Sequence, residues 1–430
     1  MTARILTYTS PARGHLFPII PVLDELRARG HKIALRTLTS YIEMAGKRGF
    51  AAAAIDSAIE RVDDYTAHTP LGAQIRAVRT LARRAPLDAS DLRDAIEQEA
   101  PDMLLVDINA WGALAVAESW GGPWASWCPY PLPLPSRDAP PFGPGFRPAR
   151  GRLGRLRDAV VAPLTFGSME RVVLPLVNQV RAAVGVPLLA DASSMFTTPP
   201  VLLYMTAEPF DYPRSDWPEN IRFVGPCDWD VPMQIPDWLR EIEQPIVLVT
   251  TSSEFQDDAR LVRAALDGLA EEPMAVIATL PAGDPGGLRR AGARVERFIP
   301  HRAVLDRAVC AVTHGGMGAT QKALAAGVPV CTVPFGRDQL EIARRLEVAH
   351  AGSRLPARRL RPDKLRAKVR EAVNCRDGAI RIAEAYRAAG GPPAAADACE
   401  QQLRTLSVTS ATYVSDSLRA PAGRDRGCRG

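Results

Sequence analysis

The segment 310–339, CAVTHGGMGATQKALAAGVPVCTVPFGRDQ, constrains the fold more than any other part of the chain. An apolar run at 309–312, typical of a buried strand, leads into it. A helical pattern covers 319–326, Gly327 ends it, and 328–333 is the next predicted strand. A strand, a tight turn, a helix and a second strand in this order favour a parallel α/β sheet.

The turn inside this segment, residues 314–318, is rich in glycine: His314 is followed by Gly315, Gly316, Met317 and Gly318. Such glycines let bare backbone approach a ligand, and the positive end of the following helix favours an anion. This glycine turn therefore predicts a phosphate-binding site. A corner that only joins a strand to a helix is the alternative, because the turn matches neither the G-x-G-x-x-G of dinucleotide folds nor a P-loop.

The length of 430 residues predicts two domains of roughly 200 residues each. A net charge of +5 is small for this length, so the arginines of 147–157 and 354–370 are expected to coat solvated faces and not to bind nucleic acid. An anion-binding role stays open for either cluster. No apolar run approaches the roughly 18 residues of a membrane span, and no signal peptide is expected. Seven scattered cysteines predict a cytoplasmic protein without a metal site or a disulfide framework.

The first part of the chain predicts a βαβ unit, with strands at 4–8 and 32–38 and a helix between them. His15 follows the loop after the first strand, which places it outside the carboxyl end of a central strand, where open α/β sheets bind their ligands. Asp107 ends another buried strand, 102–106, so a contact with His15 across one sheet edge is plausible; Asn109 is a competing choice.

The whole chain is expected to be an α/β protein with two doubly wound, Rossmann-like domains that face each other across a cleft. The last predicted helix runs from 379 to about 406. The expected N-terminal domain covers 1–225, a proline-containing linker covers 226–244, and the second domain covers 245–390. A helix end at 391–406 can pack back on the first domain, and the polar tail at 407–430 is expected not to pack.

Several further side chains follow predicted strands around the glycine turn, and together they suit a nucleotide with a polyhydroxylated appendage. The hydroxyls can bind phosphate, an aromatic ring can stack on a base, and the acidic and amide groups can bind sugar hydroxyls. Each of these residues taken alone is more often part of a turn, a helix cap or the core. The set is Ser252, Ser253, Phe298, Ile299, His301, Thr320, Asp338 and Gln339.

His15 is suited to take a proton from an incoming hydroxyl, with a carboxylate such as Asp107 fixing its tautomer. A loop histidine that only satisfies local hydrogen bonds is the alternative.

These residues and their motifs resemble family 1 glycosyltransferases of the GT-B fold, which include bacterial macrolide and antibiotic glycosyltransferases. The resemblance covers residues 4 to about 400 and rests on four motifs: RGHLFPIIP, PDMLLVD with the downstream WGALA, FIPHRAVLD, and THGGMGATQKALAAGVPVCTVPFGRDQ. It implies a nucleotide-sugar donor as co-substrate, a hydrophobic natural-product acceptor, an inverting single displacement, no metal and no other cofactor, in a monomer or homodimer.

The resemblance also implies roles for individual residues. His15 would be the general base with Asp107 as its partner, Phe298 would stack on the base, and Asp338 with Gln339 would contact the sugar. Ile299 would bind the base through its backbone, His314 and the helix after Gly318 would bind the diphosphate, and His301 stands where many members have glutamine.

Two positions depart from the family pattern. Lys322 replaces a glutamate that holds both ribose hydroxyls in UDP-sugar enzymes, and lysine accepts no hydrogen bond, which favours a dTDP-sugar. Ala319 replaces a phosphate-binding serine, so Thr320 or Ser252 is expected to serve instead.

The rival interpretations are a UDP-sugar enzyme acting on a lipid or a xenobiotic phenol, a UDP-sugar 2-epimerase-like enzyme, and a catalytically silent nucleotide-sugar binder. An epimerase needs an acidic cluster that the sequence does not show, and the pairing of His15 with Asp107 disfavours a silent binder. The acceptor pocket is expected to be shaped by the helical region 56–94 and the proline- and tryptophan-rich segment 123–148.

Overall fold

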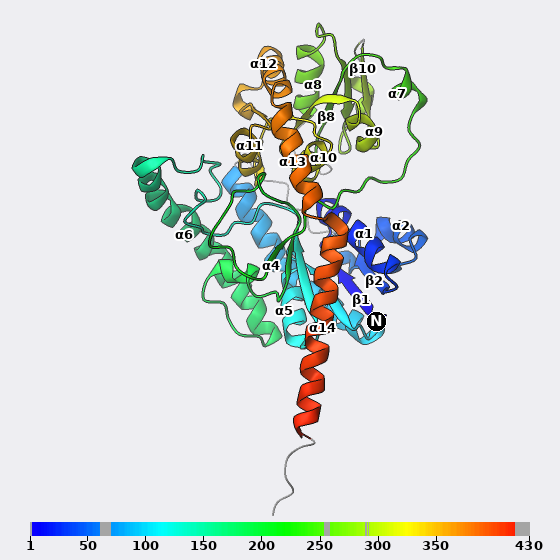
Figure 1. Ribbon diagram of the computed structural model, residues 1–430, viewed down its shortest axis with the longest axis vertical. Helices are drawn as coiled ribbons and strands as arrows, with labels where there is room; N and C mark the ends of the chain where they lie inside the picture. The colour runs from blue at the N-terminus through cyan, green and yellow to red at the C-terminus, as the bar shows by residue number, and fades with distance from the viewer. Residues whose placement is uncertain (1, 61–69, 253–258, 289, 291, 418–430) are drawn as a thin grey trace, which may run out of the picture.

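The computed structural model describes residues 2–60, 70–252, 259–288, 290 and 292–417. It has two α/β domains, drawn one above the other in Figure 1, each built on one sheet of parallel strands. The strand orders are β3-β2-β1-β4-β5-β6-β7 and β10-β9-β8-β11-β12-β13. The chain reverses direction along the sheet between β1 and β4 and between β8 and β11, which are the points where such sheets bind ligands.

The N-terminal domain contains the seven-stranded sheet and helices on both of its faces. Its strands are β1 (Arg4–Tyr8), β2 (Lys32–Thr37), β3 (Ala51–Ala54), β4 (Met103–Asp107), β5 (Trp124–Cys128), β6 (Leu202–Tyr204) and β7 (Ile221–Phe223). Its helices are α1 (Arg13–Ala28), α2 (Ile42–Lys47), α3 (Ser57–Glu60), α4 (Pro70–Glu99), α5 (Trp111–Trp120) and α6 (Gly151–Val184).

The C-terminal domain contains the six-stranded sheet. Its strands are β8 (Ile246–Thr250), β9 (Ala275–Thr279), β10 (Ala293–Glu296), β11 (Ala308–Thr313), β12 (Val330–Thr332) and β13 (Gly352–Arg354). Its helices are α8 (Ala259–Gly268), α9 (His301–Leu305), α10 (Met317–Ala325), α11 (Gln339–Val348), α12 (Pro362–Val373) and α13 (Arg376–Ala388). Helix α7 (Asp237–Glu241) lies in the preceding linker, and α14 (Gly391–Ser417) returns to the first domain.

The central strands are buried on both faces because alternate side chains enter different cores. In β4, Leu104 and Val106 pack with α4 and α5, whereas Met103 and Leu105 pack with α1. The strands that position the site are thereby fixed from two sides.

Two edge strands lack the residue pattern that predicts a strand from the sequence. β3 is a run of four alanines and β13 is Gly-Ser-Arg, and neither has the β-branched residues that mark a strand. Each forms because a neighbouring strand offers its free edge: β3 pairs with β2, and β13 pairs with β12.

The prediction of one last helix from 379 to 406 is wrong. The chain breaks at Gly390 and Gly391, whose φ angles of 90° and 60° suit glycine, and Gly391 N donates to Val224 O at 2.7 Å. The helix then continues to Ser417, so the expected tail at 407–430 is helical in its first part, and residues 418–430 lie outside the described residues.

Helix α14 leaves the second domain and lies along the first, beside α1 (Figure 1). Ala395 and Cys399 belong to the same core as α1, and His31 Nε2 lies 3.2 Å from Glu400 Oε1. The helix therefore ties the two domains together.

Helix α6 runs without a break through Pro163, although proline cannot donate a helix hydrogen bond. It is also the one helix among the described residues that is long and apolar enough to cross a membrane, with a window of mean hydropathy 1.4 that is 12% buried. Glu170 and Arg171 interrupt the apolar run, so this window does not stand out in the sequence.

The cysteines of the described residues form no disulfide, and Cys310 and Cys331 are buried in strands. Cys428 lies outside the described residues.

Candidate active site

His15 and Asp107 meet at the carboxyl edge of the first sheet. His15 lies in the first turn of α1, and its Nδ1 is 2.9 Å from Oδ1 of Asp107, the last residue of β4. The contact predicted from the strand ends is confirmed. The His15 side chain is 12% exposed and the Asp107 side chain is 0% exposed, so only the histidine can reach a substrate.

Asp107 is held as a carboxylate. Burial raises its pKa, but the charge and hydrogen bond of His15, together with hydrogen bonds from Ser10 and Asn109, lower it below its ordinary value. Ser10 donates through its backbone N–H (3.0 Å) and its hydroxyl (2.6 Å), and Asn109 through its backbone N–H (2.9 Å). The carboxylate therefore accepts the Nδ1 proton of His15 and leaves Nε2 with the basic lone pair.

Asn109 and Tyr130 complete this arrangement on the other side of the imidazole. The Tyr130 hydroxyl donates to Asn109 Oδ1 at 2.9 Å, which orients the amide so that Nδ2 faces His15 Nε2 at 3.1 Å. From the sequence alone, Asn109 is only an alternative to Asp107. The structure instead uses both, with Asn109 marking the direction from which a hydroxyl can approach Nε2.

The glycine turn adopts a conformation that needs its first two glycines. Gly315 has a φ of 92°, and a Cβ there would lie 3.2 Å from Gln339 Cβ. A Cβ on Gly316 would lie 2.5 Å from His314 Nε2, so this glycine makes room for the imidazole. Gly318 is exposed and a Cβ there would meet nothing within 4 Å, which leaves the start of α10 open. Helix α10 begins at Met317, two residues earlier than predicted.

His314 is neutral in this environment. Burial, and then the charge of Arg337, lower its pKa to about 4. At neutral pH it can offer an N–H to an anion but no charge, so positive charge near the turn comes from Arg337 and the N-terminus of α10. Arg337 was missed in the sequence because an arginine in a loop carries no signal of its own.

The low pKa of His314 predicts a loss of stability in acid. Between about pH 6.5 and about 4 the unfolded chain binds a proton on this histidine that the folded chain does not, so stability falls as pH falls through that window. His314→Asn should remove this contribution to the pH dependence. As the pH is lowered, the free energy of unfolding of the variant should decrease less steeply than that of the wild type, by about 1 kcal/mol per pH unit.

Urea unfolding at pH 7 and pH 5 measures this difference. The exposed His350 provides the control, because it has a φ of 53° that asparagine also adopts, and His350→Asn should follow the wild-type slope. Parallel curves for the wild type and His314→Asn would show that His314 is not the group responsible.

The residues predicted to bind the base follow β10: Phe298 and Ile299 lie in the loop between β10 and α9, and His301 begins α9. Phe298 is 46% exposed, and the guanidinium of Arg13 lies 5.9 Å from its ring centroid, across from the other domain. Ile299 is buried in the core. His301 Nε2 lies 3.2 Å from Thr279 Oγ1, and burial followed by the charge of Lys322 lowers the pKa of His301 to about 4.

The hydroxyls expected to replace the missing serine differ in their placement. Thr320 is 0% exposed, and its Oγ1 has no hydrogen-bond partner among the residues described, so it faces the interior and does not reach the surface of the turn. Ala319 is partly exposed in its place. Ser252 lies at the end of β8 and is 6% exposed, whereas Ser253 lies outside the described residues.

The two residues expected to contact the sugar also differ. Asp338 is partly exposed and close enough to His15 that the two interact electrostatically across the domain boundary; burial raises the pKa of Asp338, while Arg337 and His15 oppose this. Gln339 is 2% exposed, and its Oε1 accepts from Phe335 N at 2.7 Å and Gly336 N at 3.0 Å. Gln339 thus uses its carbonyl to shape the loop.

Lys322 points away from the turn toward the linker. Its Nζ donates to Trp229 O at 2.5 Å and to Asp230, and it lies 3.6 Å from Asp228 Oδ1. The ammonium is therefore held by two carboxylates of the linker that the sequence analysis did not single out.

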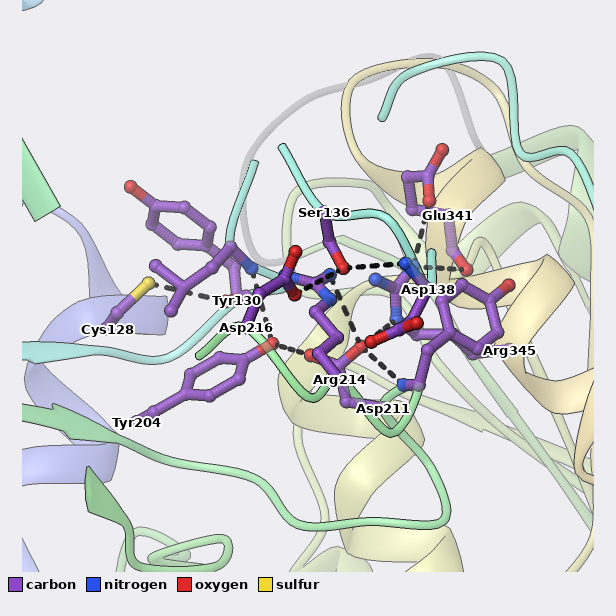
Figure 2. Close-up of polar contacts among 12 residues, drawn as sticks. Cys128, Tyr130, Ser136, Asp138, Tyr204, Asp211, Arg214, Asp216, Glu341 and Arg345 are labelled. Atoms are coloured by element: carbon purple, nitrogen blue, oxygen red, sulfur yellow. Dashed lines mark hydrogen bonds and ion pairs between the residues drawn. The ribbon is translucent and has the colours of Figure 1, made fainter. Parts of the chain in front are cut away.

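The two domains are locked together next to the site by an interdomain bridge of Asp211, Glu341 and Arg345 (Figure 2). Arg345 Nε donates to Asp211 Oδ1 at 2.9 Å and its Nη1 to Glu341 Oε2 at 2.8 Å, and all three side chains are at most 2% exposed. Glu341 Oε1 in turn accepts from the backbone N–H groups of Gly143 (2.8 Å) and Gly145 (2.9 Å). The proline-rich loop of the first domain is thereby fixed to α11, the helix that starts at Gln339.

A cavity of about 810 Å³ lies between α4 and α6. Its α4 wall belongs to the region 56–94 that was predicted to shape the acceptor pocket, whereas its α6 wall lies outside both predicted regions. Apolar and arginine side chains line it, including Ile75, Arg79, Leu176 and Val180. Neither His15 nor Asp107 is among the lining residues, so the cavity is separate from these two residues.

Comparisons with known proteins decide the family. Residues 263–402 match the model of the erythromycin biosynthesis protein CIII-like C-terminal domain. The chain is 33% identical over 408 residues to 4′-demethylrebeccamycin synthase of Lentzea aerocolonigenes, covering 90% of this chain and 96% of that protein. The chain belongs to the family 1 antibiotic glycosyltransferases.

Two further comparisons agree with this assignment. The glycosyltransferase is 26% identical over 418 residues to demethyllactenocin mycarosyltransferase of Streptomyces fradiae, covering 93% of this chain and 87% of that protein. Its fold matches the crystal structure of CalG4, the calicheamicin glycosyltransferase, with a TM-score of 0.72 and 22% identity over 94% of this chain and 98% of that one. The predicted GT-B architecture is confirmed, and the chain is an enzyme of the hexosyltransferase type that acts on natural-product acceptors.

Proposed function

We propose that this glycosyltransferase moves a sugar, a deoxysugar carried by dTDP, onto a hydroxyl of a hydrophobic acceptor with inversion and without a metal. The 2.9 Å contact between His15 Nδ1 and Asp107 Oδ1 carries the proposal, because it leaves a basic Nε2 at the sheet edge that faces the nucleotide domain. A polyketide or another large aglycone is the acceptor class, consistent with the enzyme's family.

The proposed reaction is a single displacement. The acceptor hydroxyl takes the place beside His15 Nε2 toward which Asn109 Nδ2 now points, and its proton passes to Nε2 as its oxygen bonds to the anomeric carbon. The bond from that carbon to the diphosphate breaks on the opposite face, which inverts the centre. Asp107 stabilises the imidazolium that forms.

The departing diphosphate would lie at the glycine turn. The N-terminus of α10, the N–H of His314 and the charge of Arg337 are the groups placed to stabilise it. Asp338, which interacts electrostatically with His15, would bind hydroxyls of the sugar between the two domains.

The test of the overall reaction is the anomeric configuration of the product. Nuclear magnetic resonance of a glycoside made from an α-linked donor should show a β-linkage, and chelation with EDTA should leave the rate unchanged. An α-linked product would contradict the single displacement, and loss of activity with EDTA would contradict metal independence.

Lys322 carries the donor preference. Because its ammonium is held by Asp228 and Asp230, this position presents no acceptor for a ribose 2′-hydroxyl, whereas the deoxyribose of dTDP needs none. We expect kcat/KM for a dTDP-sugar to exceed that for the matching UDP-sugar by about tenfold, which corresponds to one or two hydrogen bonds.

A variant sharpens this donor test. Lys322→Gln supplies a carbonyl acceptor and should move the ratio of the two kcat/KM values about fivefold toward UDP. Lys364→Gln, at an exposed lysine of α12, is the matched control and should leave the ratio unchanged. Equal turnover of both donors by the wild type would rule out the dTDP preference.

A further inference from the structure

The N-terminal half of α6 exposes an apolar stripe that no part of the described chain covers. Its four members are 83%, 61%, 59% and 67% exposed, in order along the helix: Leu153, Leu156, Val160 and Leu164. The spacing of three, four and four residues places all four on one face of an α-helix, along about 16 Å of its length. In Figure 1 this half of the helix stands away from both sheets.

Arginines surround the stripe. Residues 147–164 contain five arginines and one acid, a net charge of +4, and the acid, Asp158, pairs with Arg157 at 2.6 Å. Within the part of the chain that the structure describes, Arg147, Arg150, Arg152 and Arg155 have no ion pair. On a helical projection Arg152 and Arg157 flank the apolar stripe on either side, whereas Asp158 points elsewhere.

The second half of α6 shows that the helix does not cross a membrane in this fold. Val173, Val177 and Val180 pack into a core with Trp111 of α5 and Val78 of α4. A helix that is anchored in the protein by one end and exposes an apolar, arginine-flanked face at the other is suited to lie on a surface and not to span it.

We propose that this face of α6 docks the enzyme on the surface of a membrane that contains anionic lipids. The leucines of the stripe would enter the boundary between headgroups and acyl chains, and the flanking arginines would bind lipid phosphates while their stems stay apolar. The positive charge of this face favours a membrane over a second copy of the chain. A second copy would place its own four unpaired arginines against these four and repel them, whereas the negative charge of the bilayer would attract them.

Docking would also serve the chemistry, a point that rests on the proposed function. A hydrophobic acceptor partitions into a bilayer, and a surface-bound enzyme meets it at a higher local concentration than in water. The cavity between α4 and α6 adjoins the same helix, with Leu176 and Val180 in its wall.

Co-sedimentation of the full chain with vesicles tests the proposal. The probes are phosphatidylcholine vesicles with and without about one third phosphatidylserine. We expect the wild type to bind anionic vesicles and not neutral ones. The partition coefficient should be at least tenfold lower for two double variants, Leu156→Glu/Val160→Glu and Arg152→Glu/Arg157→Glu. Leu188→Glu changes another leucine, 62% exposed but outside the stripe, and should bind like the wild type.

Three results would overturn the proposal. The first is that the wild type does not bind anionic vesicles, and the second is that the stripe variants bind them as well as the wild type does. The third is that the protein does not bind vesicles but forms a stable dimer, or a complex with an acidic protein, that the same variants abolish. Circular dichroism establishes that each variant is folded. Sugar transfer to a water-soluble acceptor is measured on the same preparations and should be unchanged in all of them. If the protein binds vesicles but does not transfer sugar, the proposed function is contradicted and the docking proposal is still supported.

Discussion

Replacing Arg345 by methionine should lower the free energy of unfolding by roughly 3–5 kcal/mol. The guanidinium is 1% exposed and is the shared partner of Asp211 and Glu341, at 2.9 and 2.8 Å. Burial lowers the pKa of Arg345, but these two carboxylates more than offset that and hold it above its ordinary value. Methionine fills the space but takes away the cation that the two buried carboxylates share. Asp211 keeps Arg214 at 3.9 Å, whereas Glu341 loses its ion pair with Arg345, which costs more than the pair itself contributes.

Urea unfolding measures the loss, and Arg302→Met is its matched control. Arg302 pairs with Asp306 at 3.1 Å, but the two side chains are 63% and 58% exposed, so its removal should change stability by less than about 1 kcal/mol. A comparable small effect for Arg345→Met would mean that the interdomain bridge contributes little. Because Glu341 also holds Gly143 and Gly145, the unstable variant should in addition lose order in the proline-rich loop, visible as faster proteolysis there.

The bridge is the part of the structure that the sequence could not predict. Arg345 has the spacing of any charged residue on an amphipathic helix, and its partner Asp211 comes from another domain, 134 positions away. Only the packing of the two domains makes these charges meet in the interior. The same holds for Lys322, whose unusual position was visible but whose partners in the linker were not.

The contact between His15 and Asp107, by contrast, could be predicted. Parallel strands end at one edge, so residues that follow β1 and end β4 must lie close together, and His15 with Asp107 do so at 2.9 Å. The direction of a side chain at a helix start is harder to predict. Thr320 shares the first turns of α10 with Ala319, yet one faces the core and the other the turn, because the helix begins at Met317.

Asp107→Asn should lower kcat/KM by about 10²–10⁴-fold with little change in donor affinity. The carboxylate accepts from Ser10, from Asn109 and from His15, and an asparagine amide can accept on one side only. Its N–H₂ would face either Nδ1 of the histidine or the Ser10 donors. In both cases the imidazolium loses the negative charge that stabilises it during transfer.

His15→Ala removes the base itself and tests the central claim most directly. The measurement is the single-turnover rate of acceptor glycosylation, made beside donor affinity and thermal unfolding on the same preparation, with the exposed His350→Asn as control. We predict transfer at least about 10²-fold slower for His15→Ala, with donor binding and unfolding unchanged. Transfer within a few-fold of the wild-type rate would contradict the assignment of His15 as the general base.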